Sequence, residues 1–341
     1  MELELGLDTF GDVTNDADGH PLSQAQSIRN LVEEAVLADT LGVDFFGVGE
    51  HHRDDFVISA PEVVLAAIAS RTKQIHLGTA VTVLSSDDPV RVFERFSTLN
   101  AISSGRAEVI LGRGSFTESF PLFGFKLSDY EQLFEEKLDL FAELIKGEAV
   151  TWSGELRAPL TNQRVFPLIE QGKLKTWIGV GGSPESVIRA ARYQLPLVLA
   201  IIGGDPMRFA PYVELYKNAL SQMNSALLPI AAHSPGHIAK TDEQALDELY
   251  PHFKANRDRI GRERGWPPLT KDDYLREASQ GSLYVGSPET VATRIANTAR
   301  GLGLSRFDLK YSNGAMPHEQ LMSSIRLYGE EVIPTVRALL K

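Results

Sequence analysis

The fold is decided by a stretch that begins Ile75-His76-Leu77-Gly78-Thr79-Ala80-Val81-Thr82-Val83-Leu84 and ends at Ser115. The opening run is rich in β-branched and apolar residues, which predicts a strand covered on both faces. A helix is expected next, because Asp87 and Asp88 can cap it and Pro89 suits a first helical turn. Apolar residues then recur at the spacing of an amphipathic helix.

A second buried strand, Arg106 to Leu111, follows that helix and breaks into Gly112-Arg113-Gly114-Ser115. The unit therefore reads strand, crossover helix and parallel strand. In parallel α/β folds, ligands bind at the carboxyl ends of the strands. We expect Arg113 and its flexible neighbours to lie at such a site.

The same alternation of strands and helices continues through the chain. Eight strands are expected, at residues 3–7, 43–48, 75–84, 106–111, 176–180, 196–202, 227–232 and 306–311. Eight βα steps predict an α/β fold of the (β/α)₈ TIM barrel class, which needs about 250 residues. Residues 1–341 are accordingly read as one domain, with insertions at about 147–175 and 261–282. The first insertion has hairpin-like strands around Trp152 and Val165, and the second contains Gly265-Trp266-Pro267-Pro268, which cannot form a regular helix.

Composition narrows the class of function. The formal charge is −11 and basic residues do not cluster, which argues against a nucleic-acid partner. The absence of cysteine excludes disulfides and thiolate metal sites. No apolar run approaches a membrane span and the first residues do not resemble a signal peptide, so we expect a cytoplasmic protein with no membrane association.

Two adjacent histidines follow the second expected strand, in Gly47-Val48-Gly49-Glu50-His51-His52. His51 is a candidate acid–base residue, and the alternative is a hydrogen-bonded loop histidine. A metal site is disfavoured, because neighbouring side chains at a strand end point in opposite directions and no matching histidine pair completes a ligand set.

A candidate anion site follows the fifth expected strand, in Gly181-Gly182-Ser183-Pro184-Glu185-Ser186. Gly182 lets a ligand approach the backbone, Ser183 is placed as N-cap, and the first N–H groups of the helix favour an anion. Gly286-Ser287-Pro288-Glu289-Thr290 repeats the pattern, so only the position of the first copy, directly after a central strand, favours phosphate there. Arg113, expected two strands away, is a second candidate contact.

Other common sites are not supported. Gly112-x-Gly114 lacks the third glycine of a dinucleotide fingerprint, and Gly181-Gly182 lacks the lysine of a P-loop. No Gly-x-Ser-x-Gly elbow of a serine hydrolase occurs.

The chain resembles the bacterial luciferase-like family of flavin-dependent monooxygenases. The resemblance rests on motifs that cover nearly the whole chain in order: Glu50-His51-His52, Leu77-Gly78-Thr79-Ala80-Val81, Pro89-Val90-Arg91, Ser104-Gly105-Arg106, Gly112-Arg113-Gly114, Gly182-Ser183 and Val285-Gly286-Ser287-Pro288-Glu289.

The resemblance implies a barrel that binds reduced FMN, reacts it with O₂ and oxidises a small organic substrate. A separate flavin reductase is implied as partner, since no reductase domain is present. His51 matches the reactive histidine of luciferases, and Arg113, Ser183 and Ser186 match their contacts to the flavin phosphate. The Ala80–Val81 bond matches a backbone contact near the flavin ring and is expected to be cis.

Two departures from the family pattern affect the site. Gly182 stands where luciferases have a glutamate near the phosphate, and Gly112 stands where they have a reactive cysteine. The second departure suggests a roomier flavin face and argues against light emission. A deazaflavin-dependent oxidoreductase and a non-catalytic flavin-binding protein are the alternatives. The segment 261–282 is a candidate lid over a dry pocket.

A homodimer is predicted from the helix expected at residues 61–72. Its run Val63-Val64-Leu65-Ala66-Ala67-Ile68-Ala69 is apolar around the whole circumference. An outer barrel helix buries only one face on the sheet, so the far face needs another cover. A partner copy is favoured, and a loop of the same chain is the alternative.

Overall fold

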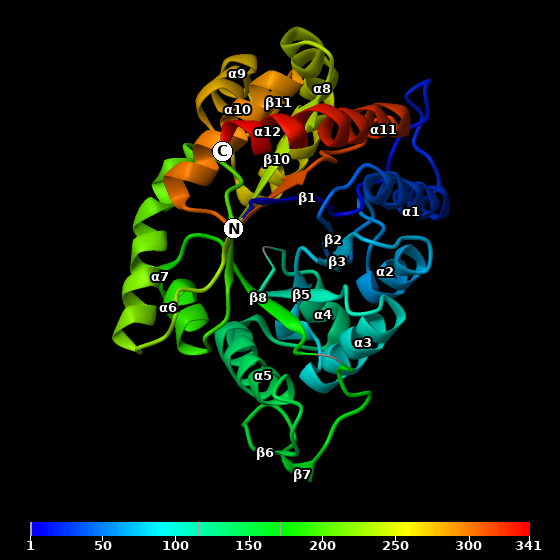
Figure 1. The fold of residues 1–341 in the computed structure, drawn as a ribbon. Helices are drawn as coiled ribbons and strands as arrows, with labels where there is room; N and C mark the ends of the chain where they lie inside the picture. Colours follow the sequence, from blue (N-terminus) through cyan, green and yellow to red (C-terminus); the bar gives the residue numbers. More distant parts are fainter. Residues whose placement is uncertain (1, 115, 171) are drawn as a thin grey trace.

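A nearly closed barrel of parallel strands forms the body of the protein (Figure 1). The computed structural model describes residues 2–114, 116–170 and 172–341, so Ser115, the expected end of the organising stretch, lies outside them. The strand order is β3-β2-β1-β12-β10-β9-β8-β5-β4. The bounds are β1 Glu4–Thr9, β2 Phe45–Val48, β3 His76–Thr79, β4 Thr82–Val83, β5 Glu108–Gly112, β8 Lys175–Val180, β9 Leu197–Ala200, β10 Ile230–Ile238 and β12 Arg306–Lys310.

The expected third strand is divided in two, and this division closes the barrel. Its first half, β3, pairs with β2, while its second half, β4, pairs with β5. An isolated bridge from Leu77 to Ala107 joins the remaining edge. When β3 and β4 are counted as one barrel strand, the barrel has eight strands and the predicted (β/α)₈ class is confirmed.

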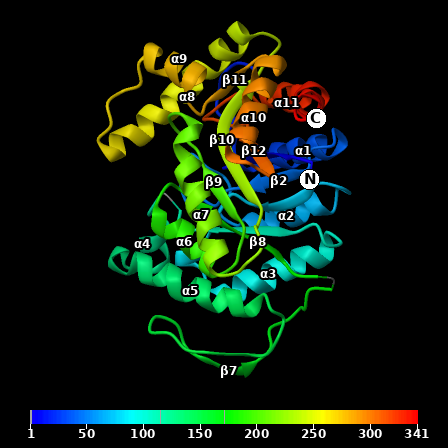
Figure 2. The same ribbon diagram turned by 60° about the vertical axis from the view of Figure 1, so that its left-hand side comes forward.

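Helices cover the outside of the barrel, as Figure 2 shows for α3, α6 and α7. The main helices are α1 Gln24–Thr40, α2 Pro61–Ala69, α3 Pro89–Ile102, α5 Tyr130–Leu144, α6 Pro184–Arg192, α7 Ala210–Gln222, α8 Asp242–Arg264, α10 Pro288–Leu302, α11 His318–Leu327 and α12 Ile333–Leu339. Short pieces are α4 Ser119–Phe123, four one-turn segments and a strand, β11 Tyr284–Gly286, which pairs in parallel with the end of β10.

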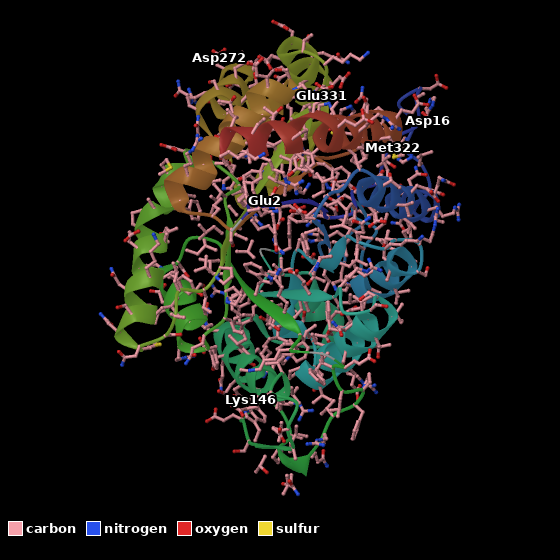
Figure 3. The ribbon with its side chains drawn as sticks, viewed as in Figure 1. Glu2, Asp16, Lys146, Asp272, Met322 and Glu331 are labelled. Carbon is pink, nitrogen blue, oxygen red and sulfur yellow. The ribbon has the colours of Figure 1, made fainter. Side chains whose placement is uncertain are left out.

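Local chemistry explains how the organising stretch folds. Asp88 accepts hydrogen bonds from the backbone N–H groups of Val90 and Arg91, so it is the N-cap of α3 as expected. Phe93 and Phe96, on one face of α3, are fully or almost fully buried. Charged side chains labelled in Figure 3, such as Lys146 and Asp272, lie at the periphery of the ribbon.

Both expected insertions have regular structure. The first contains an antiparallel hairpin, β6 Val150–Trp152 with β7 Leu160–Gln163, which lies at the opposite end of the molecule from α8 (Figures 1 and 2). The second strand was expected around Val165 and lies earlier, because the nearby Pro167 has no N–H to donate to a ladder.

The second insertion contains a helix that the sequence did not predict, α9 Lys271–Gln280. Thr270 caps it by accepting from the N–H of Asp273. The preceding Gly265-Trp266-Pro267-Pro268 is not helical, as expected. Within the described residues, no helix is both long enough and apolar enough to cross a membrane.

Candidate active site

Two connected cavities lie at the carboxyl ends of the barrel strands. The inner cavity, about 300 Å³, lies among β5, β8, β9 and β12 and is lined by residues that include Ala80, Val81 and Arg113. The outer cavity, about 640 Å³, lies between the strand ends and one face of α8. The two share Phe10, Ile202 and His233. This is the edge of the barrel where the sequence placed a binding site.

The Ala80–Val81 peptide bond is cis and lies in the wall of the inner cavity, as the resemblance implied. Glycines on neighbouring strands make room for it. A Cβ at Gly47 would lie 3.2 Å from Ala80 Cβ, and one at Gly112 would lie 2.5 Å from Val81 Cγ2. The side chain of Val81 therefore occupies the space beside Gly112, and the roomier flavin face stays a prediction.

A set of donors for an anion lies at one end of the inner cavity. Arg113 Nη2 donates to Ser186 Oγ at 3.3 Å, and the Oγ atoms of Ser183 and Ser186 are 2.8 Å apart. Ser183 is the N-cap of α6, accepting from the N–H of Ser186. Arg189, which the sequence argument did not single out, also reaches Ser186 Oγ, at 3.4 Å. The arrangement fits a phosphate group.

Arg113 is closer to this site than expected. Its strand, β5, pairs directly with β8, so the predicted separation of two strands is wrong. Its guanidinium also pairs with Glu131 and lies 5.5 Å from the centroid of the Tyr130 ring. Gly182 follows β8 with a φ of +103°, a conformation that disfavours a side chain, and its carbonyl accepts from the Tyr212 hydroxyl at 2.7 Å.

At the repeated motif Gly286–Thr290, a carboxylate of the same chain takes the place that a bound anion would have. Asp242 Oδ1 accepts from the N–H of Ser287 at 2.6 Å, and its Oδ2 accepts from Thr290 Oγ1 at 3.0 Å. Those hydrogen bonds hold the pKa of Asp242 below its usual value, although partial burial opposes them. An internal carboxylate thus occupies the anion position at α10, whereas the corresponding position at α6 opens into the inner cavity.

The two adjacent histidines point to different surroundings, as predicted. His51 is buried between three phenyl rings, with Phe56 stacked at 4.4 Å and Phe10 and Phe116 each at 5.0 Å. Its Nδ1 is 3.4 Å from Glu118 Oε1. These phenyl rings line the outer cavity, so His51 lies directly behind its wall.

Glu50 links His52 to the strand after the cis bond. Its Oε1 is 3.0 Å from His52 Nε2, and its Oε2 accepts from the N–H of Val83 at 2.9 Å. Its own N–H donates to the carbonyl of Val81 at 3.3 Å. The carboxylate and backbone of Glu50 therefore fix the position of β4.

Three titratable residues inside the barrel were missed by the sequence argument. His233 Nδ1 is 2.5 Å from Asp8 Oδ2, and both residues line the inner cavity together with Asp308. Among the described residues, Oδ1 of Asp8 and Oδ1 of Asp308 have no hydrogen-bond partner. The sequence signal that could have found these three residues is a titratable side chain within, or directly after, an otherwise apolar strand.

A buried ion pair supports the floor of this region. Arg306 Nη1 is 2.7 Å from Glu108 Oε2, and Arg306 Nε is 3.1 Å from Asp308 Oδ2. Burial disfavours the charge of Glu108, but Arg306 and nearby cations hold its pKa far below the usual range. For Asp308, burial prevails over Arg306 and raises the pKa to about 7.

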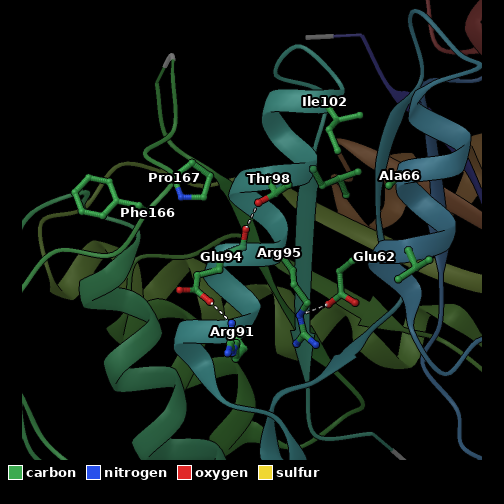
Figure 4. A pocket seen from close by; sticks show the side chains of 11 residues that line it. Glu62, Ala66, Arg91, Glu94, Arg95, Thr98, Ile102, Phe166 and Pro167 are labelled. Carbon is green, nitrogen blue, oxygen red and sulfur yellow. Dashed lines mark hydrogen bonds and ion pairs between the residues drawn. The ribbon is translucent and has the colours of Figure 1, made fainter.

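A separate hollow lies on the outer surface between α2 and α3 (Figure 4). Val63, 71% exposed, and Ile102, 50% exposed, line it together with Ala66. Phe166 and Pro167 from the first insertion lie beside α3, so a loop of the same chain covers part of the hollow. The exposed Val63 shows that the apolar far face of α2 is not fully covered.

Sequence and structure comparisons agree with this description. Residues 10–306 match the Luciferase-like monooxygenase family, and the chain belongs to that family. Limonene 1,2-monooxygenase of Rhodococcus erythropolis is 33% identical over 96% of this chain and 87% of its own length. The 4-hydroxyprotoasukamycin monooxygenase of Streptomyces nodosus subsp. asukaensis is 28% identical over 92% of this chain and 89% of its own.

Solved structures share the fold at lower identity. The monooxygenase RslO1 from Streptomyces bottropensis superposes with a TM-score of 0.83 at 22% identity, covering 97% of this chain and 99% of that one. The oxygenating constituent of 3,6-diketocamphane monooxygenase of Pseudomonas putida, in complex with FMN, has a TM-score of 0.77 at 19% identity (98% and 99% covered). An F420-dependent secondary alcohol dehydrogenase has a TM-score of 0.78 at 16% identity (98% and 99% covered). Monooxygenases and an F420-dependent enzyme thus share this fold.

Proposed function

We propose that this protein is a flavin-dependent monooxygenase that uses reduced FMN and O₂ to oxidise a small organic substrate. The observation that carries the proposal is the inner cavity, which joins the donors Arg113, Ser183 and Ser186 to the backbone at Ala80–Val81. In this placement the phosphate lies at the donors and the flavin ring lies against the Ala80–Val81 backbone. The cofactor would therefore extend from one end of the cavity to the other. The donor set and the glycine-lined wall support this placement.

In the proposed reaction, the reduced flavin supplies two electrons, one atom of O₂ enters the substrate and the other becomes water. Arg113, Gly182, Ser183 and Ser186 would bind the phosphate, and Ala80–Val81 would position the ring. Phe10 and Ile202, which line both cavities, would exclude water from the bound flavin.

His51 is proposed as the acid–base residue. It lies behind Phe10, which lines both cavities, and Glu118 holds its Nδ1 side. The contact with Glu118 fixes the imidazole orientation, and we assign the proton exchange to Nε2, which would reach the substrate when the phenyl ring of Phe10 turns aside.

The proposal also covers the domain organisation, location, reductase partner and oligomeric state of the enzyme. Residues 1–341 would act as one luciferase-like domain in the cytoplasm, and a separate reductase would supply the reduced FMN. The uncovered face of α2, with Val63 and Ala66 beside the hollow of Figure 4, is proposed to form a homodimer interface.

The structural likeness to an F420-dependent enzyme supports an alternative, hydride transfer with a deazaflavin cofactor. The third possibility is flavin binding without turnover. Anaerobic titration with reduced FMN and with reduced F420, followed by admission of air, separates the three. Tight binding of reduced FMN and oxygen-dependent oxidation of an added alkene or ketone are expected. Exclusive F420 binding would refute the monooxygenase, and FMN binding with release of hydrogen peroxide alone would favour a binding protein.

A further inference from the structure

The residues that line the outer cavity carry a net positive charge, whereas the whole chain carries a net negative charge. The chain has 45 acidic and 34 basic residues, whereas the cavity is lined by the basic residues Arg208, Arg257, Arg264, Arg276 and Lys310 and the acidic residues Asp273 and Glu277. An excess of positive charge in one cavity of an acidic protein favours anionic ligands there.

Most of these charges already have partners in the protein. Glu277 Oε1 accepts from the N–H groups of Gly204 and Ser282, each at 2.8 Å. Asp273 pairs with Arg276, and Lys310 Nζ is 3.4 Å from Asp12 Oδ2. Both acidic side chains therefore have partners within the protein. The charges of Arg276 and Lys310 are balanced by Asp273 and Asp12.

Arg257 differs from its neighbours. It projects from the cavity face of α8, with its Cζ 4.1 Å from the centroid of the Trp266 ring. Its Nη1 is shielded from solvent and meets no acceptor among residues 2–114, 116–170 and 172–341. A buried guanidinium donor without an acceptor costs free energy that an anionic ligand would recover.

The other arginines of this region show the contrast. Arg53 pairs with Asp55 and Glu263, and Arg259 is 3.3 Å from Asp55 Oδ2. Those ion pairs fasten the end of α8 to the loop after β2. Arg257 makes no such ion pair within the described part of the chain, so it is not needed for that attachment.

Apolar side chains line much of the rest of the cavity, and the polar residues His233, Asn256 and Asn313 also line it. Phe56, Phe116, Phe253 and Ile260 line it, and Phe10 and Ile202 join it to the inner cavity. A ligand that fills this space therefore meets phenyl rings near the inner cavity and a guanidinium at the α8 side. The lining suits an apolar or aromatic body that ends in an acidic group.

We propose that the substrate of this site is an organic carboxylate with an apolar or aromatic body, whose carboxylate binds Arg257 and whose body packs on the phenyl rings beside the inner cavity. The inference rests on the proposed function, because it names the substrate class of that same site. The planar guanidinium can donate two parallel hydrogen bonds to the oxygens of a carboxylate. Trp266 holds the guanidinium plane in place.

The test measures binding without flavin, so its result does not depend on turnover. Naphthalene-2-carboxylate and the uncharged 2-naphthylmethanol are dialysed to equilibrium against the protein, and free and bound probe are measured by fluorescence. The wild-type protein is expected to bind the carboxylate at least tenfold more tightly than the alcohol. Added salt should reduce only the binding of the carboxylate.

Variants of α8 identify the residue. Arg257→Gln is expected to remove the preference for the carboxylate and leave binding of the alcohol within about twofold. Arg257→Lys should retain part of the preference for the carboxylate, because it keeps the positive charge. Arg262→Gln, on the exposed side of the same helix, is the matched control and should keep the full preference. Thermal unfolding confirms that each variant is folded.

The proposal is overturned if wild type binds both probes equally or neither at millimolar concentration, or if folded Arg257→Gln retains the preference. Failure of the proposed monooxygenase activity is recognised separately, by the titration with reduced FMN. A protein that binds the carboxylate through Arg257 but does not bind FMN would support this inference and refute the proposed function.

Discussion

Val81 Cγ2 lies 2.5 Å from the position that a Cβ atom at Gly112 would occupy. The two residues face each other across adjacent strand ends, and both line the inner cavity. Glycine at 112 is therefore required by the side chain of Val81. The side chain of Val81, on the segment between β3 and β4, thus fills the space that a side chain on β5 would need.

We expect Gly112→Ala to destabilise the fold by about 1–3 kcal/mol, because Val81 is β-branched and cannot swing aside at low cost. Denaturant unfolding measures the loss. The double variant Gly112→Ala/Val81→Ala should recover most of it, since the two positions are coupled. Gly181→Ala is the stability control, because a Cβ there meets no atom within 4 Å among the described residues. Equal losses in the single and double variants would contradict the coupling.

Arg113→Ala is expected to weaken FMN binding by roughly 1.5–3 kcal/mol, because it removes a charge-assisted contact to the phosphate. Riboflavin lacks the phosphate, so its affinity should not change. Fluorescence titration with both ligands gives the comparison. Arg164→Ala, in the exposed outer part of the first insertion, serves as the control variant. If both ligands weaken equally, Arg113 does not bind the phosphate.

His51→Ala is expected to leave flavin binding nearly unchanged and to lower the yield of oxidised substrate per reduced flavin consumed. The missing product should appear as hydrogen peroxide, because the proton exchange that favours oxygen transfer is lost. Product and peroxide are quantified in the same reaction. His20→Ala, on the exposed loop after β1, is the control. An unchanged yield would remove His51 from the mechanism.

The raised pKa of Asp308 predicts a pH dependence of stability. Burial raises this pKa from 3.8 in the unfolded chain to about 7, and Arg306 only partly opposes the shift. Between these two values, the folded state binds the proton more tightly than the unfolded chain. The stability contributed by the protonated form is thus complete below about pH 3.8 and is lost progressively as the pH rises to about 7.

We expect Asp308→Asn, which resembles the protonated form, to weaken this fall in stability between pH 4 and 7. The free energy of unfolding, measured by denaturant at several pH values, tests this expectation. Asp18→Asn, in the exposed loop, should follow the wild-type curve. A wild-type curve parallel to that of Asp308→Asn over this interval would show that Asp308 is ionised throughout.

Ala66→Glu is expected to dissociate or aggregate the proposed dimer, because it places a further charge beside the exposed Val63 and Ile102 in the hollow between α2 and α3. Sedimentation at micromolar concentration distinguishes a dimer from a 37.5 kDa monomer. Ser70→Glu, at the exposed end of α2, is the control. A monomeric wild type with an unaffected Ala66→Glu variant would refute the interface.

Local sequence determined the strands, most helices and the caps, because these depend on periodicity and on neighbouring residues such as Asp88 and Ser183. The same patterns placed Arg113 and Ser186 on strand and helix ends that a barrel must bring together. The helix α9 was missed because two prolines directly before it suggested irregular structure throughout that segment.

Only the tertiary structure decided what meets inside the barrel. Asp8, His233 and Asp308 come from three strands far apart in sequence, so no spacing rule relates them. The same reason applies to Val81 and Gly112, and to Asp242, whose carboxylate closes the second copy of the anion motif. The sequence determined which side chains stand at each strand end, and closure of the sheet determined which of them share a cavity.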